Sequence, residues 1–386
     1  MLESLVKAPL KAPMTVMHVI SNLQDGGAEG ALYRLCLHTP QYHHVVVCMM
    51  DEGKYGPMLK AAGVTLHCLG MPQGKPTWQG VVRFWRLLRR LRPDVVQTWM
   101  YHADLMGGVM ARLSGVEKVF WGIRHGNLSP GTVKRSTIFV ARLCAGLSRW
   151  VPKWIVSCSQ EAVETHTAVG YDAARFKVIP NGYELSRYAP DLSARDLLRK
   201  QWGIGAQTFL LGLVARFDVQ KDHANLLAAL QHLQQQNAPF HCVLVGTGMD
   251  ASNGQLQALI QQFDVADKVS LLGRRNDVPD VMNALDVHVL SSLGEAFPNV
   301  LAEAMACGTP CVSTHVGDAA YIVGETGWMV PPQNSLALAG GLQQAMQAWS
   351  SPAGLWQARQ QAARERIAKH FSIEQMSAAY AAVWEE

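Results

Sequence analysis

The chain has 386 residues, of which 49% are hydrophobic and 17% charged, and this composition excludes a disordered protein. Its eight cysteines form no Cys-x-x-Cys pair, which favours reduced thiols over a disulfide framework or a zinc site. The net charge of +4 combines +10 in residues 1–190 (22 Lys+Arg, 12 Asp+Glu) with −6 in residues 191–386 (12 and 18). The first half should therefore face a membrane surface or a phosphorylated substrate. No nucleic acid is expected, because no base-stacking platform accompanies the basic residues.

The first 13 residues mix apolar residues with Glu3, Lys7 and Lys11, and they lack the apolar core of a signal peptide. Met14, where the first strand pattern begins, is a candidate natural start. No uncharged apolar run reaches about 18 residues, so no membrane-spanning helix is expected. We expect a cytoplasmic protein with a peripheral contact to the inner face of the cytoplasmic membrane.

Short β-branched runs alternate with amphipathic helical patterns along the chain. The first half predicts strands at 15–21, 44–50, 64–69, 94–98, 118–123, 154–157 and 176–179. After an irregular stretch, the second half predicts strands at 209–215, 241–246, 269–273, 287–291, 310–314 and 327–330. Apolar strands that alternate with helices indicate parallel sheets covered on both faces, as in α/β proteins.

Two such series predict two Rossmann-like domains, at residues 14–188 and 195–368. The last segment, 369–386, carries a helical pattern that should cross back to the first domain. Open parallel sheets bind ligands beyond the carboxyl ends of their strands, so we expect the two domains to face each other across a cleft.

The most informative segment, residues 294–310, reads GEAFPNVLAEAMACGTP. A loop carries Glu295, and Pro298 is suited to open a helix whose first amides are free to bind an anion. Glu303 then lies ~7–8 Å along that helix, so the two carboxylates should not converge on one carbon as in a glycosidase. They are suited to bind hydroxyls at opposite ends of an elongated polyol. A solvated glutamate and a helix-terminal charge would give the same spacing.

Arg216 and Lys221 follow the first predicted strand of the second domain. Two cations at the carboxyl end of a strand are suited to a diphosphate, although a solvated basic turn has the same pattern. No Asp-x-Asp occurs in the chain, so a metal-bridged diphosphate has no obvious ligands. We expect neither a metal nor another cofactor.

Together these residues resemble the retaining glycosyltransferases of family 4, which have the GT-B architecture. Five segments carry the resemblance: Gly26-Gly27-Ala28-Glu29, residues 178–182 (VIPNG), Arg216 with Lys221, residues 243–248 (VLVGTG), and Glu295 with Glu303. It extends from about Met14 to Trp384. It implies metal-independent transfer of a sugar, with retention, from a nucleotide diphosphate sugar to an acceptor hydroxyl. The implied acceptor is a lipid-linked or cell-surface polysaccharide or lipopolysaccharide precursor.

The resemblance also implies roles for matching residues. Arg216 and Lys221 would stabilise the leaving diphosphate, Glu295 would bind the donor sugar and Glu303 the ribose. His125 would lie beside the transferred sugar, and His102 is a weaker candidate. The other implied donor-binding residues are Gly26, Gly27, Gly246, Gly248, Arg274, Phe297, Asn299, Val300 and Leu301.

The chain departs from the family pattern at two positions. Family members usually have glycine where Ala296 stands, and its methyl group could narrow the approach to the diphosphate. Gly317-Asp318 replaces a frequent Gly-Gly pair, which puts a nearby donor contact in doubt.

Residues 81–92 read VVRFWRLLRRLR and predict a basic amphipathic helix. One face should carry Val81, Phe84, Trp85, Leu88 and Leu91, and the other Arg83, Arg86, Arg89 and Arg90. Such a helix is suited to an anionic membrane, and a second basic stretch at 134–153 supports this interpretation. A surface helix packed against the sheet by its apolar face has the same pattern.

Three rival functions can be weighed against the transferase. Residues 246–251 fit a Gly-x-Gly-x-x-Ala dehydrogenase fingerprint, but they follow the second strand of their domain rather than the first. A sugar-nucleotide epimerase on the same scaffold would bind the nucleotide without a separate acceptor. A catalytically silent partner protein would need none of the four charged residues at 216, 221, 295 and 303.

Overall fold

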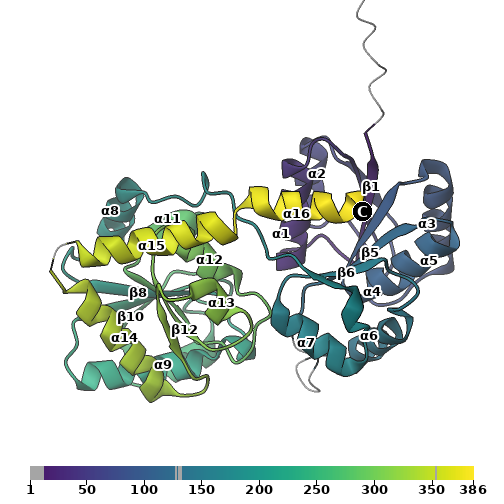
Figure 1. The fold of residues 1–386 in the computed structure, drawn as a ribbon. Helices are drawn as coiled ribbons and strands as arrows, with labels where there is room; N and C mark the ends of the chain where they lie inside the picture. Colours follow the sequence, from purple (N-terminus) through teal and green to yellow (C-terminus); the bar gives the residue numbers. More distant parts are fainter. Residues whose placement is uncertain (1–12, 127, 129–132, 353) are drawn as a thin grey trace, which may run out of the picture.

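The computed structural model describes residues 13–126, 128, 133–352 and 354–386 (Figure 1). Residues 1–12 lie outside this description, and with them most of the segment predicted to lack the apolar core of a signal peptide. Two sheets with parallel strands form two α/β domains, which confirms the predicted fold class. Each predicted strand is present, and its ends differ from the prediction by at most two residues.

The first sheet has seven strands in the order β3-β2-β1-β4-β5-β6-β7. Its strands are β1 (Thr15–Ile20), β2 (His43–Cys48), β3 (Thr65–Cys68), β4 (Val95–Trp99), β5 (Lys118–Ile123), β6 (Trp154–Ser157) and β7 (Phe176–Val178). Its helices are α1 (Gly27–His38), α2 (Tyr55–Ala61), α3 (Trp78–Leu91), α4 (Tyr101–Ala103), α5 (Val109–Leu113), α6 (Arg135–Leu147) and α7 (Gln160–Val169). A π-helical turn, η1 (Asp104–Gly108), joins α4 to α5, and a 3₁₀ turn, η2 (Ala173–Arg175), precedes β7.

The second sheet has six strands in the order β10-β9-β8-β11-β12-β13. Its strands are β8 (Phe209–Val214), β9 (Phe240–Val245), β10 (Val269–Leu271), β11 (Val287–Leu290), β12 (Cys311–Thr314) and β13 (Trp328–Val330). The helices are α8 (Leu192–Gln201), α9 (His223–Gln235), α10 (Gly254–Gln262), α11 (Val278–Ala284), α12 (Asn299–Ala306), α13 (Ala319–Val323), α14 (Ser335–Trp349), α15 (Leu355–His370) and α16 (Ile373–Glu385). Two 3₁₀ turns are η3 (Val219–Lys221) and η4 (Ala266–Lys268).

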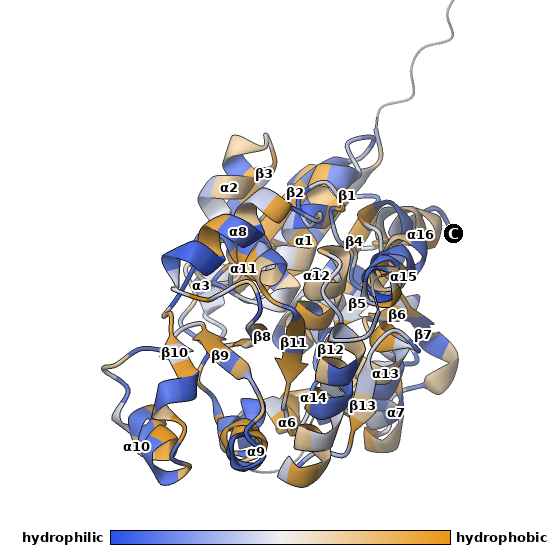
Figure 2. Cartoon of the chain, turned by 90° about the vertical axis from the view of Figure 1, so that its left-hand side faces the viewer, coloured by the Kyte–Doolittle hydropathy of each residue, from blue (hydrophilic) through white to orange (hydrophobic). Residues whose placement is uncertain are grey.

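Burial explains why these segments are strands. All six residues of β8 and five of the six in β1 are buried, because helices cover both faces of each sheet. The strands of the second sheet are coloured as hydrophobic in Figure 2, whereas the surrounding helices carry both colours. This arrangement leaves the carboxyl ends of the strands as the edge where polar groups can gather.

The last helix returns to the first domain (Figure 1). Where the chain crosses, the Tyr183 amide donates to the Phe371 carbonyl and the Ile373 amide to the Tyr183 carbonyl, each at 3.0 Å. The side chains of Tyr380 and Trp384 on α16 are fully buried in the core of the first domain. Both connections between the domains are therefore bonded to each other at one point.

The basic helix α3 packs on the sheet through Phe84 and Leu88, which are buried. Trp85, which the sequence places on the same apolar face, is 49% exposed. Residue 85 lies about 100° around the helix from residue 84, at the margin of the apolar stripe. In the described part of the chain, each helix is either too short or too polar to cross a bilayer.

Candidate functional site

Lys221 and Glu295 meet at the carboxyl edge of the second sheet. Their Nζ and Oε1 atoms lie 2.5 Å apart, and the Ser292 hydroxyl donates to the same oxygen at 2.7 Å. Lys221 ends the turn after β8, and Glu295 lies in the loop after β11, the strand that pairs with β8. The fold thus brings together two of the residues predicted to contact the donor.

Arg216 lies in the same β8 loop but points to solvent. Its side chain is 67% exposed, and its Nε donates to Asp218 at 3.1 Å. Burial alone would raise the pKa of Asp218, but the Gln220 amide and the Arg216 guanidinium outweigh it and hold the pKa below its usual value. Arg216 must therefore turn away from this carboxylate to reach a diphosphate beside Lys221.

The Gly246-x-Gly248 turn fits closely against the end of β8. Gly246 has φ +144°, and a side chain there would place its Cβ 1.9 Å from the Ala215 carbonyl oxygen. The Phe217 amide donates to the Thr247 carbonyl at 2.8 Å. The glycines allow this turn to approach the loop that carries Arg216.

Helix α12 begins at Asn299, after Pro298. The Leu301 amide donates to the Pro298 carbonyl at 3.1 Å, and the Leu301 side chain is fully buried. Phe297 is also buried and packs edge-on against Phe371. Of the predicted backbone donors at this helix start, Asn299 and Val300 precede the intrahelical ladder, whereas the Leu301 amide is already bonded.

Glu303 has different neighbours from Glu295. Burial raises its pKa, while Arg34 of the first domain and the Tyr188 hydroxyl act in the opposite direction. The Arg34 guanidinium also lies 5.6 Å from the centre of the Tyr183 ring. The two carboxylates thus belong to separate parts of the site, as the predicted elongated ligand requires.

Asn299 also joins the two domains, a contact that the sequence did not indicate. Its Oδ1 accepts from the Asn181 side chain at 2.9 Å and from the Tyr183 hydroxyl at 2.5 Å. Arg124 in turn donates to Asn181 at 2.5 Å. A Cβ on Gly27 would lie 3.2 Å from the Asn299 Nδ2, so the first glycine-rich loop faces the start of α12. Gly26 instead faces the Glu29 side chain, whose carboxylate would have to move to admit a Cβ there.

The predicted donor residue Arg274 makes another contact between domains. Its guanidinium lies 2.8 Å from Asp25, which also pairs with Lys54 at 2.7 Å, and all three side chains are about half exposed. Asp25 directly precedes the first glycine-rich loop, which starts at Gly26, so Arg274 contacts the first domain next to this loop.

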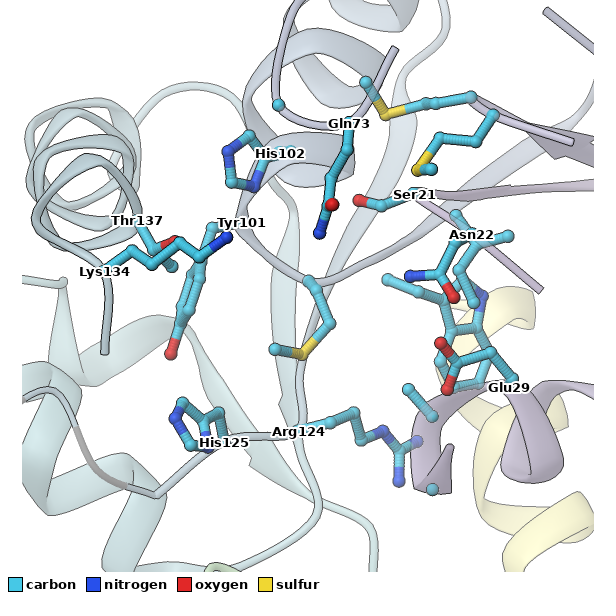
Figure 3. Close-up of a pocket in the computed structure, with 18 of the residues that line it drawn as sticks. Ser21, Asn22, Glu29, Gln73, Tyr101, His102, Arg124, His125, Lys134 and Thr137 are labelled. Atoms are coloured by element: carbon cyan, nitrogen blue, oxygen red, sulfur yellow. The ribbon is translucent and has the colours of Figure 1, made fainter. Parts of the chain in front are cut away.

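A cavity of about 680 Å³ lies beside these residues (Figure 3), lined mostly by the first domain and closed by Phe297 and Asn299 of the second. Both candidate histidines line it, and burial lowers the pKa of each, with Glu295 opposing the effect at His125. The cavity is also lined by Met49, Met50, Met71, Met100, Tyr101, Arg124 and Lys134. His125 and His102 therefore lie on the wall of the same cavity.

Two features of this cavity could not be predicted from the sequence. The Tyr101 hydroxyl is 2.8 Å from His166 Nε2, and His166 Nδ1 is 2.6 Å from the Ala162 carbonyl, so His166 positions the tyrosine. Met100 has φ +73° and ψ +158°, a region that glycine almost alone adopts. Backbone strain of this kind gathers at functional sites.

One group of side chains in the described residues has metal-ligand spacing: His18, Cys36 and His44, all buried. Its ring nitrogens already have partners. His18 Nε2 lies 3.0 Å from His44 Nδ1, the Trp99 indole donates to His18 at 3.3 Å, and His44 Nε2 lies 3.0 Å from the Thr39 carbonyl. This group is a hydrogen-bonded part of the core and does not fit a metal ion.

Comparisons with known proteins agree with this geometry. The family model "Glycosyltransferase Family 4" matches residues 25–187, and "Glycosyl transferases group 1" matches residues 208–348. An *Escherichia coli* relative, UDP-Gal:alpha-D-GlcNAc-diphosphoundecaprenol alpha-1,3-galactosyltransferase, is 27% identical over 247 residues, which are 62% of each chain. A D-inositol 3-phosphate glycosyltransferase of *Xylanimonas cellulosilytica* is 32% identical over 177 residues, 44% of this chain and 42% of its own.

The matched segments thus span less than two thirds of these two relatives. Among solved structures, HepE of *Anabaena* in complex with UDP has a TM-score of 0.84 at 21% identity, covering 96% of this chain and 100% of its own. A glycosyltransferase of *Rickettsia africae* has a TM-score of 0.81 at 17% identity, with 97% and 98% covered. The two family models together match most of both domains, and the chain belongs to the family 4-like glycosyltransferases with the GT-B fold.

Proposed function

We propose that the protein transfers a sugar, with retention of configuration, from a nucleoside diphosphate sugar to an acceptor hydroxyl. The observation that carries the proposal is the Lys221–Glu295 pair at the carboxyl edge of the second sheet, next to the histidine-lined cavity. Solved structures of HepE contain UDP and UDP-glucose, which supports a nucleotide-sugar donor for this chain.

The reaction breaks the bond between the anomeric carbon and the diphosphate oxygen and forms one to the acceptor oxygen on the same face. The proton of the acceptor hydroxyl passes to the leaving diphosphate. Lys221, Arg216 and the first amides of α12 compensate the charge that develops there, so the protein itself supplies electrostatic stabilisation without a metal ion. Glu295, held by Lys221 and Ser292, binds a sugar hydroxyl rather than attacking the anomeric carbon.

The acceptor in this proposal is a sugar linked through phosphate to a lipid. Four methionines of the cavity provide an adaptable apolar wall, and Lys134 and Arg124 provide cations for phosphate oxygens. The *Escherichia coli* relative takes its name from an acceptor of this kind, a diphosphoundecaprenol-linked sugar.

Thermal unfolding with UDP, GDP, ADP, CMP and NAD tests the donor site. A ligand at 100 times its Kd stabilises a protein by about 2.7 kcal/mol, which should raise Tm by several degrees. We expect one nucleoside diphosphate to do so for the wild type and the exposed-site control Glu365→Ala, but not for Glu303→Ala. A shift with NAD alone would overturn the proposal. A product assay separates transfer, which needs an acceptor, from epimerisation, which does not.

We also propose that α3 contacts an anionic membrane. Arg83, Arg86 and Arg90 line a groove between α3 and the edge strand β3, and no ion pair involves them within the described residues. Trp78 and Trp85 on the same helix are 79% and 49% exposed, which suits the bilayer interface.

Vesicle binding tests this contact. On vesicles with anionic lipid, Arg86→Gln should weaken binding more than Arg89→Gln, which removes the same charge. The Arg89 guanidinium lies over the Trp85 ring at 5.8 Å and does not line the groove. If the two variants lose the same binding affinity, the arginines attract the membrane only by diffuse electrostatics, at about 1 kcal/mol per arginine, and the groove makes no specific contact. Unaltered activity on a lipid acceptor after all four arginines become glutamine would refute the contact.

A further inference from the structure

The side chain of Asp318 reaches from the second domain into the first. One carboxylate oxygen accepts from the Gln160 amide at 3.1 Å, and the other from the Glu161 amide at 3.3 Å. Gln160 and Glu161 are the first two residues of α7, whose amides have no partner within the helix. Asp318 is only 6% exposed, so the contact is shielded from water.

The start of α7 is shared between the domains. Ser159, the residue before the helix, accepts from the Ala162 amide at 3.1 Å, which bonds the third amide of the helix. Asp318 bonds the first two. The first two amides of α7 therefore have this hydrogen-bond acceptor only when the two domains are in contact.

The same residue holds the donor loop. The Asp318 amide donates to the Ala296 carbonyl at 3.0 Å. Gly317 before it has φ +52°, and a Cβ there would lie 2.5 Å from the Glu295 carbonyl oxygen and 2.6 Å from that of Ala296. Residues 317–318 therefore fix the backbone that presents the Glu295 side chain to Lys221.

We propose that Asp318 is a positioning residue. By bonding to the start of α7 in the first domain, it fixes the position of the loop that carries Glu295. The inference rests on the proposed function, because it assigns a consequence for donor binding. The position of Glu295 then depends on the contact between the domains, and the donor loop takes its binding geometry only when they meet. The Asp318 carboxylate thus supplies a link between the domains.

Three variants test this link: Asp318→Ala, Asp318→Asn and, as a matched control on the same helix, Ser159→Ala. Asp318→Ala should raise the donor KM about tenfold with kcat little changed, because a charge-assisted hydrogen bond that holds a binding group is lost. Asp318→Asn keeps one accepting oxygen and should recover most of the affinity. Ser159→Ala removes a cap within the first domain and should leave the donor KM within about twofold.

Amide hydrogen exchange, measured with no donor added, tests this link between the domains. Asp318→Ala should speed exchange both at the first turn of α7 and at residues 294–297, whereas Ser159→Ala should speed it at α7 alone. Unchanged exchange at 294–297 in Asp318→Ala, or equal effects of the two variants, would overturn the inference. If the wild type transfers no sugar, the proposed function fails, but the exchange result still decides the role of Asp318.

Discussion

Lys221 and Glu295 bond to each other at the carboxyl edge of the second sheet, with 2.5 Å between Nζ and Oε1. The cation expected on the diphosphate and the carboxylate expected on the sugar thus hold each other in place. The ammonium group has three donors, so it can keep Glu295 and still reach a phosphate oxygen. Burial and the nearby Lys221 lower the pKa of His288 to about 3, so His288 adds no positive charge beside the lysine near pH 7.

Replacing Lys221 tests whether this pair acts in catalysis. Lys221→Ala removes the charge that compensates the leaving diphosphate, and a lost electrostatic group of this type costs about 10²–10³ in kcat. We expect a fall of that size in the rate of nucleoside diphosphate release with acceptor present. Lys200→Ala, at an exposed lysine on α8, provides the control and should keep the wild-type rate. A loss of under tenfold at Lys221 would assign it to structure alone.

Gly126 tests how closely the domains must approach. A Cβ on this residue of the first domain would lie 2.8 Å from the Ala296 Cα and 3.0 Å from the Glu295 carbonyl oxygen. Gly126→Ala should therefore push the domains apart and raise the donor KM at least severalfold, while each domain stays folded. Small-angle scattering should show a larger radius of gyration for the variant.

The control for this substitution is Gly146→Ala on α6. A Cβ there would meet nothing within 4 Å, and alanine is favoured over glycine in a helix by about 1 kcal/mol. This variant should gain stability and keep the wild-type donor KM. If Gly126→Ala also keeps the wild-type donor KM, the contact at Ala296 is not needed for donor binding.

Sequence reasoning succeeded where the signal is local and failed where it is a contact between distant segments. Strands such as β8 are recognisable because a buried parallel strand is apolar throughout. The meeting of Lys221 and Glu295 follows from the same pattern, because each comes after such a strand, while their roles toward a donor stay predictions. The Asn181–Asn299 bond joins residues 118 positions apart, so no spacing could indicate it. The departure at Asp318 was visible, but its α7 partner was not.

Asp104 predicts a pH dependence of stability. Its Oδ1 accepts from the Thr98 hydroxyl at 2.5 Å, its Oδ2 is buried without a partner among the described residues, and burial raises its pKa to about 7. Between about pH 4 and pH 7 the folded protein thus holds a proton that the unfolded chain has released, so this group's contribution to stability falls as the pH rises. Asp104→Asn should remove that fall.

The measurement is urea unfolding of wild type and Asp104→Asn at pH 4.5 and pH 8. The variant should be more stable than the wild type by about 2–4 kcal/mol at pH 8 and nearly equal to it at pH 4.5, where the carboxyl is protonated in the folded protein. The comparison cancels the titration of all other groups. An advantage that is the same at both pH values would show that Asp104 is not protonated in the folded state near neutrality.

Met100 offers a test that separates the effect of its backbone conformation from the effect of its side chain. Its backbone, at φ +73° and ψ +158°, costs about 1–3 kcal/mol for any residue with a Cβ, whereas glycine adopts it freely. Met100→Ala removes the side chain from the cavity but keeps the strain, and Met100→Gly removes both. The glycine variant should therefore be about 1–3 kcal/mol more stable than the alanine variant in urea unfolding. Both should raise the acceptor KM, because both lose the apolar wall that the methionine provides. If alanine is the more stable of the two, the backbone at residue 100 is not strained, and the strain cannot serve to hold a methionine in the acceptor cavity.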